Sequence, residues 1–188
     1  MTDQDLHGVL DFLRGAEQLK NTLRSGRTSN GRQESTAEHT WRLCLMILLF
    51  GHQYPDIDVL KLMKMCIIHD LGEAVNGDIP AVDQAGVGEK AGEERNDLVL
   101  LLRTLPSYLQ EEILTLWDEY ETASSHEAKL AKAFDKIETV LQHTQGKNPP
   151  DFDYGFNLDY GKVYTDYDEL TSRLRRVIDA DTEVLSRR

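Results

Sequence analysis

One short stretch of the sequence, MCIIHDLGEAVNGDIP, ends an apolar run with a histidine and three acidic residues: His69, Asp70, Glu73 and Asp78. Residues three and four apart on a helix share a face, so the first three side chains can converge at one helix end. Such groups are costly to hold against an apolar core without partners. Imidazole and carboxylate are ligands that divalent cations prefer, so the stretch favours a metal site. For His69-Asp70 alone, a capping or ion-pair cluster at an exposed helix end is the alternative.

Two distant residues strengthen the metal interpretation. His39 lies one turn into a helix whose start is predicted by Ser35 and Glu38, the spacing of a capping box. Asp135 lies in the middle of EAKLAKAFDKIETVLQ, where an isolated carboxylate on an apolar helix face needs a partner. The apolar neighbours of Asp135 are Ala131, Phe134, Ile137 and Leu141.

In chain order, the combination of His39, His69-Asp70 and Asp135 resembles the HD-domain phosphohydrolase superfamily. The resemblance covers roughly residues 5–145. It implies an all-α fold, a helical bundle around a metal site, and it implies that these four residues are the metal ligands.

A narrower resemblance rests on two segments. HDLGEAVNGDIP and RQESTAEHTWRL are similar to the corresponding segments of the 5′-deoxynucleotidase-like branch of that superfamily. This resemblance implies that Glu73 and Asp78 belong to the active site without binding the metal, and that Arg24 contacts the substrate. An aromatic residue follows that arginine in bacterial members of the branch and helps to select deoxyribose, whereas Ser25 follows it here.

Residues 20–33, KNTLRSGRTSNGRQ, form a basic segment in an otherwise acidic chain. The segment contains Lys20, Arg24, Arg27 and Arg32 and no acidic residue. Because arginine suits forked contacts with phosphate, Arg24, Arg27 and Arg32 are candidate substrate-binding residues. A solvated basic loop is the alternative.

These residues predict a metal-dependent phosphomonoesterase, 5′-nucleotidase-like, that acts on nucleoside or deoxynucleoside 5′-monophosphates by attack of a metal-bound hydroxide. A bound metal lowers the pKa of water from ~15.7 toward ~7 in favourable zinc sites. In this scheme Glu73 orients the water or protonates the leaving 5′ oxygen, and Asp78 holds the water, Glu73 or a sugar hydroxyl.

We expect one divalent ion as the cofactor. Two nitrogen and two oxygen ligands leave room for water and suit Mn²⁺, Co²⁺, Fe²⁺ or Ni²⁺, and they also allow Zn²⁺. Members of the superfamily with two metals typically add histidines between the His-Asp pair and the last aspartate. Between Asp70 and Asp135 this chain offers His126 only.

Two alternatives stay open for the function. The first is hydrolysis of another small phosphorylated metabolite or of a nucleoside triphosphate. The second is a non-catalytic HD scaffold that binds nucleotides. Glu73 and Asp78 argue against the scaffold, because retention of a metal does not require them.

Apolar spacing predicts helices over residues 4–24, 57–74, 83–103, 107–121, 124–145 and 167–186, and a helix after Ser35. Residues 25–34 are expected to form a loop. We expect one HD domain over residues 1–188, with its core at about 5–145, a long loop at 146–166 and a C-terminal helix at 167–188. An interface arm or a packed surface loop is favoured over a lid for 146–166.

Composition sets the remaining expectations. The chain of 188 residues is 40% hydrophobic and 29% charged, which is typical of a soluble globular protein. Its net charge of −12 disfavours extended nucleic-acid binding. No apolar run approaches the ~20 residues of a membrane span, so we expect no membrane partner. The acidic start resembles neither a signal nor a transit peptide, which favours a cytoplasmic protein. The superfamily often forms dimers, so a homodimer is allowed.

Overall fold

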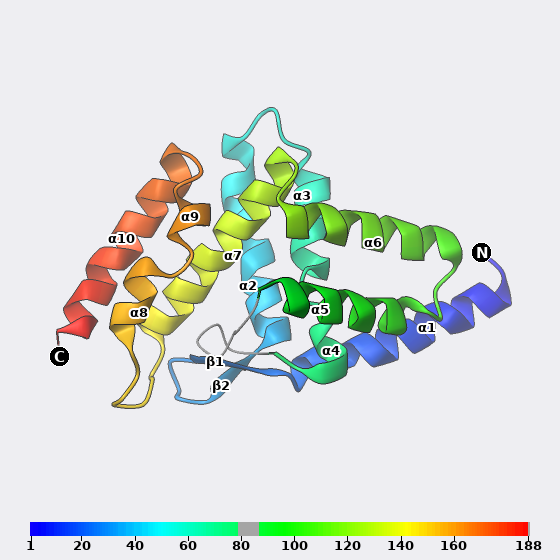
Figure 1. The fold of residues 1–188 in the computed structure, drawn as a ribbon, viewed down its shortest axis with the longest axis horizontal. Helices are drawn as coiled ribbons and strands as arrows, with labels where there is room; N and C mark the ends of the chain where they lie inside the picture. The colour runs from blue at the N-terminus through cyan, green and yellow to red at the C-terminus, as the bar shows by residue number, and fades with distance from the viewer. Residues whose placement is uncertain (79–86, 188) are drawn as a thin grey trace.

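The computed structural model describes residues 1–78 and 87–187, with the backbone alone for residues 87–90. This part of the chain is mainly helical, as the sequence predicts (Figure 1). The helices are α1 (Asp3–Ala16), α2 (Thr36–Phe50), α3 (Val59–Ile68), α4 (Glu73–Asn76), α5 (Val87–Leu102), α6 (Ser107–Thr122), α7 (His126–Gln145), α8 (Tyr154–Asp159), α9 (Lys162–Thr165) and α10 (Glu169–Ser186). The expected all-α bundle is confirmed.

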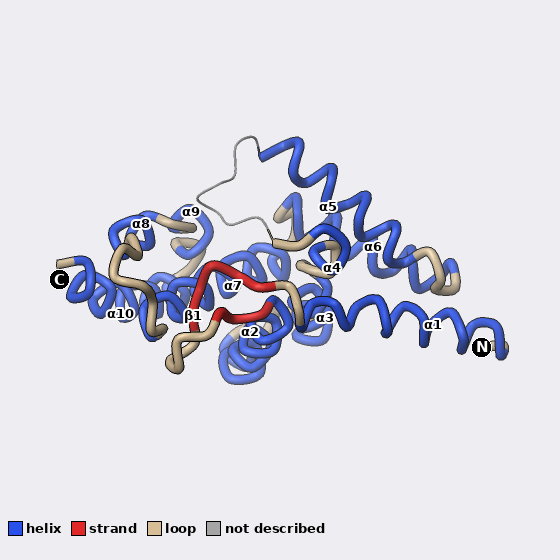
Figure 2. The backbone as a smooth tube through the Cα atoms, turned by 90° about the horizontal axis from the view of Figure 1, so that it is seen from below, coloured by secondary structure: helices blue, strands red, loops and turns tan. Residues whose placement is uncertain are grey.

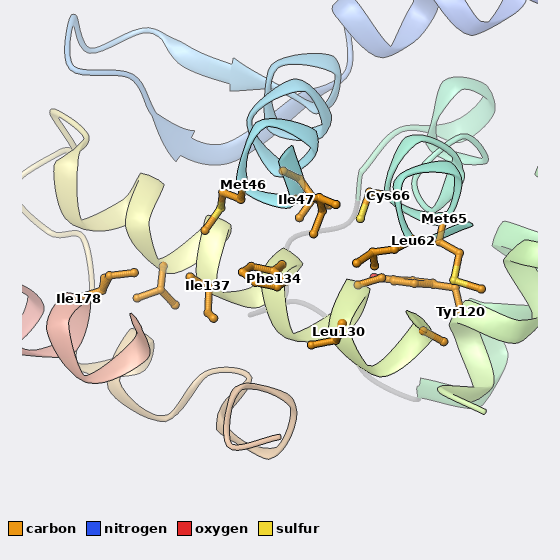
Figure 3. Close-up of a cluster of buried hydrophobic side chains, with 14 residues drawn as sticks. Met46, Ile47, Leu62, Met65, Cys66, Tyr120, Leu130, Phe134, Ile137 and Ile178 are labelled. Atoms are coloured by element: carbon orange, nitrogen blue, oxygen red, sulfur yellow. The ribbon is translucent and has the colours of Figure 1, made fainter. Parts of the chain in front are cut away.

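Helix α7 runs through the middle of the bundle and packs against α2, α3, α6, α9 and α10 (Figure 1). Most of its residues are buried, and they include charged residues such as Asp135 and Glu138 as well as apolar ones. The apolar cluster around it is drawn in Figure 3 and includes Met46, Ile47, Leu62, Met65, Cys66, Tyr120, Leu130, Phe134, Ile137 and Ile178. Fully burying one such aliphatic or aromatic side chain stabilises the fold by about 1.5–3 kcal/mol.

The start of α2 follows the predicted capping box. The Ser35 side chain accepts a hydrogen bond from the backbone N–H of Glu38, and the Glu38 carboxylate accepts one from the backbone N–H of Ser35. The box therefore fixes where the helix begins, and His39 lies on its first turn with no exposed surface.

Residues 25–34 are not simply a loop. They contribute to an antiparallel hairpin of β1 (Leu23–Arg27) and β2 (Gln33–Ser35), seen beside α7 and α2 in Figure 2. The turn closes with a hydrogen bond from the Thr28 N–H to the Arg32 carbonyl oxygen, and Gly31 has a φ of 86°. The strands are short and rich in Arg, Ser and Gly, so no alternation of apolar residues predicted them.

The helix expected over residues 57–74 is interrupted. Helix α3 ends at Ile68, residues 69–72 form a turn, and α4 begins at Glu73. The turn is held by hydrogen bonds from Leu71 N–H to the Ile68 carbonyl and from Glu73 N–H to the Asp70 carbonyl. Gly72 is required there, because a Cβ atom would lie 2.6 Å from the carbonyl oxygen of Glu94 in α5.

Residues 146–166 are not a long loop, because they contain the short helices α8 and α9. The Asp153 side chain caps α8 by accepting from the Phe156 N–H at 3.1 Å. Such short helices give too few turns for an apolar period to appear in the sequence. Arg175 of α10, with 2% of its side chain exposed, holds the segment in place. It donates to the carbonyl oxygens of Tyr160 at 2.6 Å, Asn157 at 2.5 Å and Leu158 at 3.2 Å.

Cys44 and Cys66 are free thiols. The remaining expectations concern membranes and assembly. None of the helices in the described ranges combines the length and the apolar character needed to span a bilayer. The homodimer stays a prediction, and so does the single domain over residues 1–188.

Replacing Arg175 with methionine is expected to lower the free energy of unfolding by about 3 kcal/mol, because buried carbonyl oxygens lose their donors. Urea unfolding of the full chain measures the change. Arg176→Met is the matched control, since Arg176 is the exposed next residue of α10 and its loss is expected to cost within about 0.5 kcal/mol. Equal losses for the two variants would contradict the anchoring role of Arg175.

Candidate metal centre and active site

His39 reaches the site from the first turn of α2. Its Nδ1 atom makes a short hydrogen bond with the carboxylate Oε2 of Glu138 on α7. The other ring nitrogen, Nε2, lies 3.2 Å from Oδ1 of Asp135 and 3.8 Å from Oδ2 of Asp70. The imidazole is thus held on one side and faces two carboxylates on the other.

His69 stands in the turn after α3, and its ring is oriented by the helix that precedes it. Its Nδ1 atom lies 2.9 Å from the carbonyl oxygen of Cys66, which accepts the hydrogen bond. Its Nε2 atom lies 3.1 Å from Oδ2 of Asp70 and 4.0 Å from Oδ1 of Asp135. Trp117 of α6 donates from Nε1 to the His69 carbonyl oxygen at 3.0 Å and so fixes the turn.

Asp135 is buried on α7, with 3% of its surface exposed. Its Oδ2 atom accepts a hydrogen bond from the Tyr120 hydroxyl at 3.0 Å and lies 2.9 Å from Nζ of Lys136. Its Oδ1 atom is the one that faces His39 and His69. The two oxygens therefore face different partners, and one remains directed at the two imidazoles.

Three of the four candidate ligands, His39, His69 and Asp70, form a group that could hold a divalent cation. The Nε2 atoms of His39 and His69 are buried, and neither has a hydrogen-bond partner among the described residues. Ligand atoms of His39, His69 and Asp70 all lie within 4.8 Å of one another. A proton on each Nδ1 leaves the Nε2 lone pair free, which is how neutral histidine binds a metal. An ion at this point would satisfy both nitrogens.

The charge around His39 also favours a cation. Burial and Arg24 lower the pKa of His39, but the carboxylates of Glu138 and Asp135 raise it to about 10 overall. The surrounding carboxylates thus stabilise a positive charge on this ring. A divalent ion that replaces the proton supplies that charge.

Glu138 is a residue that the sequence analysis missed. It has no exposed surface, and besides His39 it binds Arg42, whose Nε donates to Oε1 at 2.6 Å. A carboxylate that orients a histidine from behind is the usual outer partner of a metal-binding imidazole. The signal was present, because Glu138 follows Asp135 by one helical turn and shares its face of α7.

A cavity of about 730 Å³ opens beside the candidate ligands. His69, Asp70 and Asp135 line one end of it, together with Glu73 and Asp78. Segment 146–166 forms another wall, through Phe152, Asp153, Phe156, Asn157, Tyr160 and Tyr164. The segment packs against α7 and α10, as a packed segment was expected to do, and the interface arm stays a prediction.

Glu73 is held at the edge of the site by α2. Its Oε2 atom accepts a hydrogen bond from the Thr36 hydroxyl at 3.0 Å. Burial, reinforced by the negative charges of Asp70 and Asp78, raises the pKa of Glu73 to about 9. Asp78 lines the cavity as well and is the last residue described before the segment at 79–86.

The structure brings two of the three candidate arginines to the cavity. In β1, the Nη1 atom of Arg24 lies 3.4 Å from Oδ2 of Asp70, and its Nη2 atom donates to the Thr139 hydroxyl at 3.2 Å. Arg27 also lines the cavity. Arg32 does not appear among the described lining residues and instead pairs with Glu38 at the surface.

Two lysines of α7 add positive charge that the sequence analysis missed. Lys132 and Lys136 both line the cavity, one turn apart on α7. Lys132 lies 3.0 Å from Oε1 of Glu121 and 4.1 Å from the ring centre of Tyr120. Nothing in the local pattern distinguished these lysines from a solvated helix face.

The fold and the site define a known class. Residues 16–175 match the family model of the HD domain, so the chain belongs to the HD-domain family. Membership implies a divalent metal, and the His, Asp and Glu groups described above are candidates to hold it.

Individual proteins of known name are similar to this chain over most of its length. The chain is 34% identical over 153 residues to the 5′-deoxynucleotidase HDDC2 of Dictyostelium discoideum, and the match covers 77% of this chain and 80% of that protein. The 5′-deoxynucleotidase HDDC2 of Homo sapiens is 33% identical over 139 residues, and the match covers 73% of this chain and 67% of that protein. The crystal structure of a predicted metal-dependent phosphohydrolase from Magnetospirillum magnetotacticum is similar to this one with a TM-score of 0.84. It is 25% identical, and the match covers 98% of this chain and 94% of that one.

Replacing Glu138 with glutamine is expected to weaken the affinity for Mn²⁺ or Co²⁺ about 10- to 100-fold, because the imidazole of His39 loses its charged outer partner. Titration of the metal into chelator-treated protein gives the affinity. Glu111→Gln, at an exposed position on α6, is the control with expected wild-type affinity. Unchanged binding by the Glu138 variant would show that this carboxylate does not support a metal ligand.

Proposed function

We propose that this protein is a metal-dependent phosphohydrolase that releases phosphate from nucleoside or deoxynucleoside 5′-monophosphates. The observation that carries the proposal is the group of His39, His69 and Asp70, whose ligand atoms all lie within 4.8 Å of one another and of which His69 and Asp70 line the cavity. Arg24 and Glu73 reach the same cavity. The 5′-deoxynucleotidase relatives support the choice of substrate class.

His39, His69, Asp70 and Asp135 are the proposed ligands of one divalent ion. Two nitrogen and two oxygen donors suit Mn²⁺, Co²⁺, Fe²⁺ or Ni²⁺, and they allow Zn²⁺. When bound, such an ion lowers the pKa of a water molecule and polarises a phosphoryl oxygen.

Arg24 and Arg27 are the proposed phosphate contacts. In phosphoryl transfer the protein mainly positions the phosphate and neutralises the charge on its equatorial oxygens. Arg24 lies 3.4 Å from Asp70 and is held by Thr139, so its guanidinium is placed beside the proposed ligands before substrate arrives. Lys136, whose Nζ atom lies 2.9 Å from Oδ2 of Asp135, adds an ammonium group beside the proposed ligands.

Glu73 is the proposed acid–base group and Asp78 its partner in the cavity. Thr36 holds one oxygen of Glu73, which keeps the carboxyl group at the cavity edge. From there Glu73 can exchange a proton with the attacking water or with the leaving 5′ oxygen. Asp78 lines the same edge and can hold a water molecule or a sugar hydroxyl.

Colorimetric phosphate release from a panel of nucleotides, with Mn²⁺ or Co²⁺ added, checks the proposal. We expect release from nucleoside or deoxynucleoside monophosphates and loss of it after treatment with a chelator. Faster release from nucleoside triphosphates or other phosphorylated metabolites would select the first alternative. Tight nucleotide binding without release under any metal would select the non-catalytic scaffold.

Replacing Glu73 with glutamine is expected to lower kcat about 10²- to 10⁴-fold while the metal content stays that of the wild type, because a proton-transfer group is lost and no ligand is. Asp135→Ala is the contrasting variant, expected to lose metal by elemental analysis while remaining folded. Full activity of Glu73→Gln would remove the acid–base role, and full metal occupancy of Asp135→Ala would remove that ligand.

A further inference from the structure

One face of α7 follows the cavity from the candidate metal centre to its far end. Asp135, Thr139 and His143 succeed one another by single helical turns, and all three line the cavity. Asp135 belongs to the metal end, and Thr139 accepts the hydrogen bond from Arg24. His143 lies about two turns, or roughly 12 Å, beyond Asp135 along the helix axis. This span is comparable with the length of a nucleoside monophosphate.

The far end holds a polar group without a partner. Nδ1 of His143 lies 2.9 Å from Oδ1 of Asn157 in α8. Because the partner is an amide oxygen, which accepts, the ring donates from Nδ1, and burial lowers the pKa of His143, which favours the neutral ring. This hydrogen bond fixes the amide and leaves its Nδ2 donor buried, with no partner in the described part of the chain. Asn157 is 1% exposed and lines the cavity, so a ligand there is a natural acceptor for this donor.

Aromatic rings flank the same end. Phe152 packs edge-on against His143, with ring centres 5.1 Å apart. Phe156 lies one residue before Asn157, lines the cavity and leaves 38% of its surface exposed. Its ring is tilted by 30° from that of Tyr160, 5.5 Å away. A partly exposed phenyl ring beside an unpaired amide donor is the chemistry that recognises a flat, polar-edged ligand such as a nucleobase.

The wall that carries these groups is held firmly against α7. Arg175 binds the carbonyl oxygens of Asn157 and Tyr160 from behind. Gly161, with a φ of 69°, permits the close approach, because a Cβ atom there would lie 2.7 Å from Cβ of Lys136. Rigid support of this kind lowers the ordering cost of binding a ligand.

We propose that the α8 end of the cavity is the nucleobase subsite, in which Phe156 stacks on the base and Nδ2 of Asn157 donates to a carbonyl or ring nitrogen of it. The proposal rests on the proposed function, since it places the two ends of one substrate. Phosphate lies at Arg24 and the metal ligands, and the base lies at His143 and Asn157. Phe156 and Asn157 are thus specificity-determining residues.

Calorimetry with the full-length, Mn²⁺-loaded protein tests the subsite with two separate probes, deoxyadenosine and inorganic phosphate. Deoxyadenosine carries the base but has no phosphate to release, so its binding is measured without turnover. We expect Phe156→Ala to weaken deoxyadenosine binding about tenfold, as the loss of one stacking partner does, and to change phosphate binding less than twofold.

Asn157→Asp separates the hydrogen bond from stacking. The substitution keeps an acceptor oxygen for His143 and removes the Nδ2 donor, so deoxyadenosine binding is expected to weaken about tenfold as well. Tyr108→Ala is the matched control, because Tyr108 is an aromatic residue, 56% exposed, on α6 and away from this cavity. It is expected to bind both probes as the wild type does.

The possible results are distinct. Selective loss of deoxyadenosine binding in Phe156→Ala supports the subsite, even where Asn157→Asp fails to fold. Equal effects on the two probes, wild-type binding by Phe156→Ala, or no deoxyadenosine binding by the wild type would overturn it. Failure of the proposed function gives a different result, which is the absence of phosphate release from nucleotides by the wild type.

Discussion

Two carboxylates buried on α7, Asp135 and Glu138, constrain the arrangement of the helices around them. A buried charge is unfavourable unless other groups compensate it. Here the compensation comes from separate elements: Tyr120 of α6 binds Asp135, and His39 and Arg42 of α2 bind Glu138. The central helix therefore fixes its neighbours through polar contacts as well as through the apolar cluster, and these polar contacts converge on one point.

The same contacts leave one nitrogen of each candidate histidine ligand without a hydrogen-bond partner among the described residues. Each imidazole, His39 and His69, is held through Nδ1, so both Nε2 atoms are fixed in the interior before any ligand arrives. Asp135 is likewise held through one oxygen and directs the other at the imidazoles. A preorganised set of this kind loses little freedom when it binds an ion. Arg24, which lines the cavity, is likewise held in place before a ligand binds, because it donates a hydrogen bond to Thr139.

The sequence predicted the helices for physical reasons that act locally, and it predicted the candidate ligands through their residue types and their order along the chain. The capping box of Ser35 and Glu38 and the apolar periods are properties of neighbouring residues, so α2 and α7 appear almost as expected. Asp135 was identifiable because a carboxylate is costly on an apolar helix face, and His39 because its order along the chain with His69, Asp70 and Asp135 resembles the HD superfamily. The hairpin, the break after Ile68 and the wall of α8 and α9 depend on contacts between distant segments, so no local pattern revealed them.

The two ends of the cavity depend on different kinds of residues. This difference explains why the sequence predicted the reaction class and not the selectivity. The proposed chemistry depends on side chains whose type is decisive, because few residues other than His and Asp can bind a metal. The proposed ligand recognition at the far end depends on Phe156 and Asn157. Both residue types are common in proteins, so only their position in the fold indicates this role. Arg175 sets that position by binding backbone oxygens of the wall. The reaction class was therefore accessible from motifs, whereas selectivity required the packing of α8 and α9 against α7.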